Sequence, residues 1–300
     1  MFFHASFSRE KTSVAKSEHI RFEDLESEKN TLEANPETDI DVGGRGIGMR
    51  IKESIPKNIA IECVCATIAA ATRIMYCLMY PIPIRDSYTY KMFIEQWISN
   101  GAIPENGGYP PLGLFLLKIP AELFQCEIIR GGIIVNVTIG LLIVIELIRL
   151  SREIVNSSFV ALCVGLISAT HPLLIDFSCH MSRENSYMLF CCLSIIFFIR
   201  FLKRGSYALA TGSAFFSALA FLCRDEALEL AVIIVSIICF CKSMSRTRRV
   251  KTISVFAAGY LLSILMTLYA IGVPCSYFYS YYHRIAILYP NIKAFDSILF

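Results

Sequence analysis

Carboxylate and arginine side chains recur at the polar ends of long apolar segments in this sequence. Asp86 follows the first apolar segment, whereas Arg183 and Glu184 stand directly before a later one. Arg224 follows the apolar segment after that. A carboxylate can take the proton of a hydroxyl group as a general base, and an arginine can neutralise a phosphate that develops negative charge. These residue types indicate a reaction between a hydroxyl acceptor and a phosphate leaving group at the edge of an apolar body.

The composition places these residues in a membrane protein. Hydrophobic residues make up 55% of the 300 residues, charged residues make up 18%, and the mean hydropathy is +0.56. Soluble domains of this length rarely have such a composition, so we predict an all-α polytopic membrane protein with about seven transmembrane helices. The predicted spans cover residues 58–80, 131–149, 157–176, 186–200, 206–223, 227–241 and 252–273.

Three regions follow from this pattern. Residues 1–57 are polar and rich in acidic side chains, which predicts a disordered tail in the cytoplasm. Residues 58–273 form the transmembrane module, and residues 274–300 form a tail on the outer side. Most of the twelve cysteines stand inside apolar runs, where they are expected to pack as small hydrophobic residues.

The first outer loop, residues 81–130, is the longest polar interruption of the module. After the charged pair Arg85-Asp86, apolar residues recur with helical spacing at Tyr90, Phe93, Ile94, Trp97 and Ile98. A Pro- and Gly-rich break separates them from a second apolar run, residues 112–117, which Lys118 and Pro120 follow. The pattern predicts two short amphipathic helices that lie flat at the membrane interface.

Basic residues predict the orientation. With seven spans, one side of the membrane holds fourteen Lys and Arg residues in short loops, and the other side holds eight in longer segments. The positive-inside rule places the first set in the cytoplasm. Asp86, Asp176, Arg183, Glu184 and Arg224 then all lie on the outer side.

Alternatives remain for several of these residues. Arg73 stands inside the first span and either faces the outer loops or forms a structural ion pair with Asp86 or Glu62. Asp86 is also suited to cap the helix that follows it. His180 and Glu184 are four residues apart, so they and Asp176 are an alternative set of divalent-metal ligands.

The order of these motifs resembles the GT-C superfamily of polytopic glycosyltransferases, which use polyprenyl-phosphate sugars. The likeness is strongest to dolichyl-phosphate-mannose protein mannosyltransferases and to aminoarabinose lipid transferases, and it covers about residues 58–273. It is carried by Asp86-Ser-Tyr after a span with Arg73, by Pro110-Pro111-Leu112, by SATHPLLIDFSCHMSREN and by FLCRDEALEL. Two positions depart from the family: Ser87 replaces a second acid, and Tyr109 replaces a Lys that some relatives carry.

The resemblance implies roles for individual residues. It makes Asp86 and Glu184 the catalytic carboxylates, with Asp176 as the second choice for the latter position. Arg224 matches a basic residue that faces the carrier phosphate. The substrate-binding candidates are Arg73, Arg85, Tyr109, Lys118, Asp176, Arg183 and Arg224.

The predicted activity is the transfer of a sugar from a polyprenyl-phosphate carrier to a hydroxyl acceptor on the outer face of the membrane. The partners are then membrane lipids, the lipid-linked sugar and an unidentified hydroxyl acceptor, with no nucleic acid. No cofactor is identified, although some relatives use a divalent metal. The expected location is the inner membrane in a bacterium or the endoplasmic reticulum in a eukaryote. The alternatives are a small-molecule transporter and a non-catalytic or truncated multi-pass membrane protein.

Overall fold

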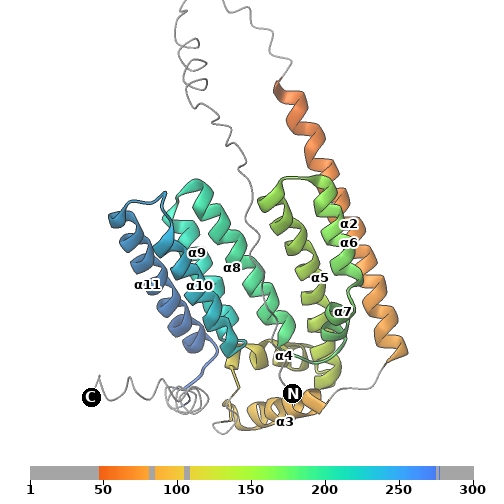
Figure 1. Cartoon of the computed structure of the whole chain (residues 1–300). Coiled ribbons are helices and arrows are strands. Elements are labelled where there is room, and N and C mark those ends of the chain that lie inside the picture. Colours follow the sequence, from red (N-terminus) through yellow and green to blue (C-terminus); the bar gives the residue numbers. More distant parts are fainter. Residues whose placement is uncertain (1–46, 81–84, 105–108, 275–276, 278–300) are drawn as a thin grey trace, which may run out of the picture. The chain divides into compact units, whose positions relative to one another are not determined.

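The computed structural model describes residues 47–80, 85–104, 109–274 and 277 (Figure 1). The chain divides into two compact units, Met1–Arg50 and Ile51–Phe300. Almost all of the first unit lies outside the described residues, so the account below concerns the second. Its described part is helical and contains no β-strand.

The helices follow each other through short connections. Their bounds are α2 Ile47–Met79, α3 Arg85–Asn100, α4 Pro111–Phe124, α5 Ile128–Val155, α6 Ser158–Thr170, α7 Pro172–Cys179, α8 Glu184–Arg204, α9 Tyr207–Phe221, the 3₁₀ turn η2 Asp225–Ala227, α10 Leu228–Phe240 and α11 Arg246–Ala270. Each of the seven predicted apolar segments coincides with one helix or, for residues 157–176, with the pair α6 and α7. The prediction of an all-helical protein is therefore confirmed.

Fewer helices than predicted are long enough to cross a membrane. In the described part, α5, α8, α11 and the segment Ile59–Met79 of α2 have the length and hydropathy of a span. The helices α6 and α7 pass together as a fifth span that is bent by 52°. The helix α9 has 15 residues, and α10 has 13. At 1.5 Å per residue they reach about 20 Å, short of a hydrocarbon core of about 30 Å.

The first helix begins earlier than the sequence predicts. Residues 47–57, assigned above to the disordered tail, form the start of α2 in the structure. The segment IGMRIKES consists mostly of Ile, Met, Arg, Lys and Glu. All of these except Ile are among the better helix formers. The remainder of the predicted tail, residues 1–46, lies outside the described residues.

Small side chains let the helices of the bundle approach closely. The Ser194 hydroxyl of α8 donates to the backbone carbonyl of Ser213 in α9 at 2.9 Å, and both residues are fully buried. Ala210 and Ala214 are also buried on α9. Small residues and interhelical hydroxyl bonds are typical of helix contacts inside membranes.

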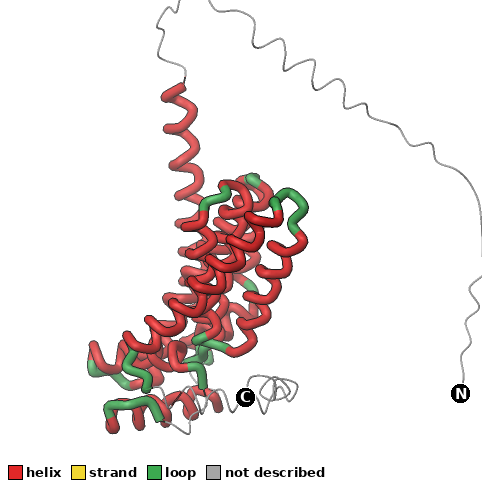
Figure 2. The backbone as a smooth tube through the Cα atoms, turned by 90° about the vertical axis from the view of Figure 1, so that its left-hand side faces the viewer, coloured by secondary structure: helices red, strands yellow, loops and turns green. Residues whose placement is uncertain are grey.

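The two helices of the first predicted outer loop lie across the bundle at one end (Figures 1 and 2). Tyr90, Ile94 and Trp97 of α3 are buried in one cluster with Leu114 and Leu117 of α4. The predicted amphipathic face is thus correct at these three positions, whereas Ile98 is 42% exposed. The backbone N–H of Leu112 donates to the carbonyl of Leu222 at 3.0 Å, which joins the start of α4 to the end of α9.

Candidate functional site

Arg183, the residue before α8, lies at the centre of a polar cluster at this end of the bundle. Its guanidinium packs over the rings of Tyr90 and Tyr109, with 5.4 Å and 4.8 Å from Cζ to the ring centroids. Its Nε donates to the Tyr90 hydroxyl at 3.2 Å. Two aromatic faces stabilise a guanidinium by cation–π attraction while leaving part of its donor edge open. Among the described residues, no carboxylate forms an ion pair with Arg183.

Gly113 of α4 leaves room for the side chain of Arg183. A Cβ on Gly113 would lie 3.0 Å from Cγ of Arg183, so glycine lets the arginine stem cross α4 at close range. Nη1 of Arg183 also approaches the carbonyl of Cys223 at 3.5 Å. Arg183 therefore contacts α3, α4 and the end of α9 together.

Arg224 forms the second charged group of the cluster. Its Nη1 donates to Glu184 at 3.1 Å, and its Nε and Nη2 form a two-point contact with Glu226 at 3.1 and 2.7 Å. It also lies over the ring of Tyr187, 5.8 Å from the centroid. Two carboxylates thus share this guanidinium, which fixes its direction.

The Arg224–Glu226 contact persists at neutral pH. The hydrogen bonds from Arg224 hold the pKa of Glu226 below its usual range. A carboxylate with a lowered pKa keeps its charge and its partner at neutral pH, and it loses them only as the pH falls through that lowered value.

Asp86 lies in the first turn of α3 and is exposed. Ser87, the next residue, is buried, and its hydroxyl donates to the carbonyl of Met181 at 3.2 Å. This bond ties the start of α3 to the loop that carries Arg183. Tyr90 follows Asp86 by one helical turn, so the carboxylate stands on the same face of α3 as the tyrosine that contacts Arg183. Burial raises the pKa of Tyr90, and the charge and hydrogen bond of Arg183 oppose this rise.

A buried polar layer supports the loop between α7 and α8. The Asn136 side chain of α5 donates to the carbonyls of His180 and Ser182 at 2.6 and 2.9 Å. The Asn185 side chain of α8 donates to the Asn136 carbonyl at 3.0 Å and to the Ser178 hydroxyl at 3.2 Å. Since Arg183 and Glu184 lie between these anchored residues, the layer sets their positions.

Arg73 belongs to this layer and not to the exposed cluster. Its side chain is fully buried, its Nε donates to Ser178 at 3.0 Å, and its Nη1 donates to the carbonyl of Ala169 at 3.3 Å. That carbonyl lacks its usual helical partner because the helix breaks at His171 and Pro172. The alternative of an ion pair between Arg73 and Asp86 or Glu62 is wrong, because Arg73 bonds to Ser178 and Ala169 while Glu62 bonds to Arg149 and Arg152.

Asp176 and His180 form a separate pair beside this layer. The Tyr76 hydroxyl donates to Oδ1 of Asp176 at 2.8 Å, and Nε2 of His180 lies 3.2 Å from the same oxygen. The alternative of a metal site with Glu184 is not supported by this geometry, because Glu184 turns to Arg224. In the part of the chain that the structure describes, no three His, Cys, Asp or Glu residues are grouped to hold a metal ion.

The remaining predicted residues have different surroundings. Lys118 pairs with Glu122 at 2.8 Å and lies over the Trp97 ring at 4.7 Å, apart from the arginine cluster. Tyr109 lies within the cluster, and its carbonyl accepts a hydrogen bond from the Tyr277 hydroxyl. The side chain of Arg85 lies outside the described residues.

Three positions of the cluster and its supporting layer were not predicted as part of the site. Tyr90 was assigned only to the apolar face of α3, although it holds Arg183. Asn136 stands fully buried within a span, and a carboxamide inside an apolar run is the signal that would have identified it. Glu226 was seen beside Arg224 but not as its partner.

The fold and the cluster together define a class of protein. The described chain is a helical membrane protein with four or five helices apolar and long enough to cross a membrane, with α3 and α4 across one end and Arg183, Glu184 and Arg224 gathered there. The chain belongs to the dolichyl-phosphate-mannose-protein mannosyltransferase family, a glycosyltransferase family of GT-C type, whose model matches residues 109–271, more than half of the chain. No curated protein matches the chain. Asp86 and Arg73 precede the matched residues.

Proposed function

We propose that the protein transfers a sugar from a polyprenyl-phosphate carrier to a hydroxyl acceptor at the end of the bundle covered by α3 and α4. The observation that carries this proposal is the Arg183 guanidinium, packed against two tyrosine rings with no carboxylate partner among the described residues. A cation fixed in this way is suited to a phosphate, because binding the phosphate requires no existing ion pair to break.

The roles of the neighbouring residues follow from their contacts. Asp86 takes the proton from the acceptor hydroxyl, whose oxygen bonds to the anomeric carbon of the sugar as the bond from that carbon to the phosphate oxygen breaks. The electron pair stays on the phosphate, and Arg183 and Arg224 stabilise the charge that develops there. Glu184 accepts a hydrogen bond from Arg224 at 3.1 Å and is therefore assigned as a positioning residue. Tyr109, whose ring packs against Arg183, is assigned as a second positioning residue.

The membrane arrangement is part of the same proposal. The residues of the cluster gather at one end of the bundle, and most basic residues of the described helices gather at the opposite end. There, Arg152 bonds to Glu62, Arg200 bonds to Glu153, and Arg248 bonds to the carbonyl of Gly205. We infer seven crossings, with α9 and α10 as short ones, and place the cluster on the outer side.

Removing the guanidinium of Arg183 tests the phosphate site. We expect Arg183→Gln to weaken binding of the polyprenyl-phosphate donor by about tenfold to a hundredfold, the loss of one charge-assisted contact of about 1.5–3 kcal/mol. Arg224→Ala is expected to weaken binding in the same range. Donor affinity is measured by titration of purified, folded protein with a fluorescent polyprenyl-phosphate sugar.

A control separates local from general effects. Arg130 of α5 is highly exposed and pairs only with the nearby Glu127 at 3.0 Å, so Arg130→Gln should leave donor affinity unchanged. If both variants, Arg183→Gln and Arg130→Gln, bind the donor as tightly as the wild-type protein, Arg183 does not contact the phosphate.

Single cysteines test the orientation. In a background without reactive native thiols, a cysteine at Ser99 of α3 is expected to react with an impermeant reagent on intact cells or sealed vesicles of known sidedness. A cysteine at Ser245, before α11, is expected to react only after permeabilisation. Both serines are exposed in the structure, so access depends on the membrane alone. Labelling of Ser245 but not of Ser99 would reverse the topology.

A further inference from the structure

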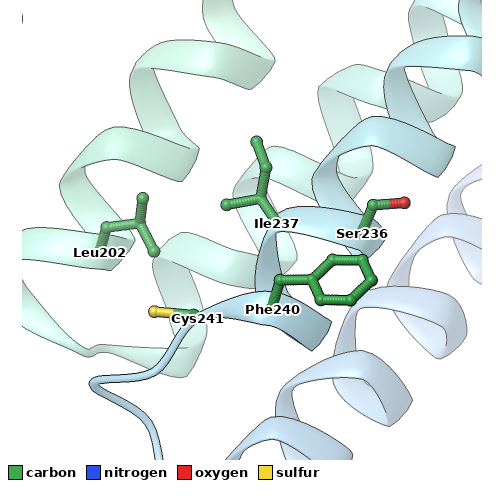
Figure 3. Close-up of a pocket in the computed structure, with 5 residues that line it drawn as sticks. All are labelled: Leu202, Ser236, Ile237, Phe240 and Cys241. Atoms are coloured by element: carbon green, nitrogen blue, oxygen red, sulfur yellow. The ribbon is translucent and has the colours of Figure 1, made fainter. Parts of the chain in front are cut away.

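A hollow of about 390 Å³ lies at the end of the bundle opposite the arginine cluster. It is lined by Leu202 of α8 and by Ser236, Ile237, Phe240 and Cys241 of α10 and its C-terminal end (Figure 3). Phe240 is 82% exposed, and Leu202 and Ile237 are exposed by 41% and 44%. The walls are almost wholly apolar, so the hollow suits a hydrocarbon chain and not a polar solute.

Two arginines of α11 stand at the ends of the helices that form this hollow. Nη2 of Arg248 donates to the carbonyl of Gly205, the residue that ends α8, at 3.2 Å. Nη1 of Arg249 donates to the carbonyl of Cys239, in the last turn of α10, at 2.7 Å. Each guanidinium has five N–H donors, so most of the donors remain after these bonds. Nε of Arg249 is buried without a hydrogen-bond partner.

The positive charge at this place has no carboxylate partner among the described residues. Residues 242–251 contain five basic residues and no acidic one: Lys242, Arg246, Arg248, Arg249 and Lys251. None of the five forms an ion pair with a carboxylate of the described residues. By contrast, Arg152 pairs with Glu62 at 2.7 Å and Arg200 pairs with Glu153 at 2.6 Å at the same end of the bundle. The excess positive charge is therefore local to the α10–α11 segment.

We propose that this hollow and the two arginines beside it bind an acidic phospholipid. One acyl chain fills the space between Leu202 and Ile237, and the phosphate of the head group lies on Arg248 and Arg249. The apolar walls and the unpaired charges fit the two chemically different ends of one such molecule. Basic residues at a membrane surface attract acidic lipids with about 1 kcal/mol each, roughly a fivefold effect per residue. This site is independent of the sugar-transfer reaction, because it lies at the other end of the helices.

Photocrosslinking tests the site on the full chain. The protein is placed in phosphatidylcholine nanodiscs that contain a trace of phosphatidylglycerol with a photoactivatable acyl chain, and crosslinked peptides are identified by mass spectrometry. We expect peptides that contain residues 236–241 to be crosslinked more strongly by this probe than by photoactivatable phosphatidylcholine. Unlabelled phosphatidylglycerol should compete, and inorganic phosphate should not. Equal crosslinking by both lipids, or competition by phosphate alone, overturns the proposal.

Matched variants separate a defined site from general charge attraction. Arg248→Gln with Arg249→Gln should lower crosslinking by phosphatidylglycerol about 25-fold, fivefold for each arginine. The control variant, Arg204→Gln with Arg246→Gln, removes the same charge from the same end of the bundle but leaves Arg248 and Arg249 in place. It should retain most of the crosslinking by phosphatidylglycerol. Leu202→Trp fills the hollow without a change of charge and should also abolish the lipid preference. Equal losses in the two double variants, or no effect of Leu202→Trp, contradict a defined site.

Discussion

Asp86→Asn is expected to lower the turnover of sugar transfer by about 10²-fold or more, because it removes the group that takes the proton of the acceptor. The substitution preserves the size of the side chain, and Asn is compatible with a helix start. Asp86 is exposed in the first turn of α3 and forms no ion pair with the described side chains, so folding should not suffer. Turnover is measured on a labelled donor at matched amounts of folded protein.

A neighbouring carboxylate provides the control for this experiment. Glu95 is exposed on the same helix and pairs only with Lys91, at 3.7 Å. Glu95→Gln should therefore keep normal turnover, donor affinity and thermal stability. Turnover of Asp86→Asn close to wild type would show that Asp86 is not the base, and Glu184 would be the next residue to substitute.

Arg73→Ala is expected to lower the free energy of unfolding by about 3–5 kcal/mol, the largest stability effect that we predict for one residue. The change empties a fully buried volume and leaves the carbonyl of Ala169 with one donor fewer at the break between α6 and α7. It also removes the bond that links α2 to Ser178 and, through it, to Asn185. Unfolding is measured by denaturant titration in detergent micelles.

Thr72 offers a comparison at the same carbonyl. Its hydroxyl donates to Ala169 at 3.0 Å, and Thr72→Val should cost only about 1 kcal/mol, because it removes one hydrogen bond and no volume. If Arg73→Ala is no more destabilising than Thr72→Val but binds the donor weakly, Arg73 belongs to the substrate site and not to the supporting layer.

The helical architecture was predictable because it depends on local hydrophobic pattern. The spacing of Tyr90, Ile94 and Trp97 correctly identified the buried face of α3, and the apolar runs correctly located the helices of the bundle. The number of spans was less predictable. The turn at Gly205 precedes α9, and η2 separates α9 from α10, so these turns limit the lengths of both helices. A hydropathy average over a window of residues does not detect such turns.

Side-chain pairing was the part that the sequence could not supply. Arg183, Glu184 and Arg224 were singled out by type and position, but apart from the local pair Arg224–Glu226 their partners come from distant segments. Arg183 meets Tyr90, which is 93 positions away, and Arg224 meets Glu184, which is 40 positions away. For Arg73 the sequence left two alternatives, the outer loops or a carboxylate partner, whereas the structure places it on the carbonyl of Ala169 at the break before Pro172.

Release of sugar from its lipid carrier tests the proposed function most directly. Purified wild-type protein is incubated with polyprenyl phosphates that carry radiolabelled mannose or aminoarabinose, together with membrane extract as a source of acceptors. The lipid-soluble donor and the products are then separated by extraction and chromatography. We predict that label leaves one of these donors with wild-type protein and stays on it with Asp86→Asn. Label that remains on every donor that the wild-type protein binds would contradict a glycosyltransferase function.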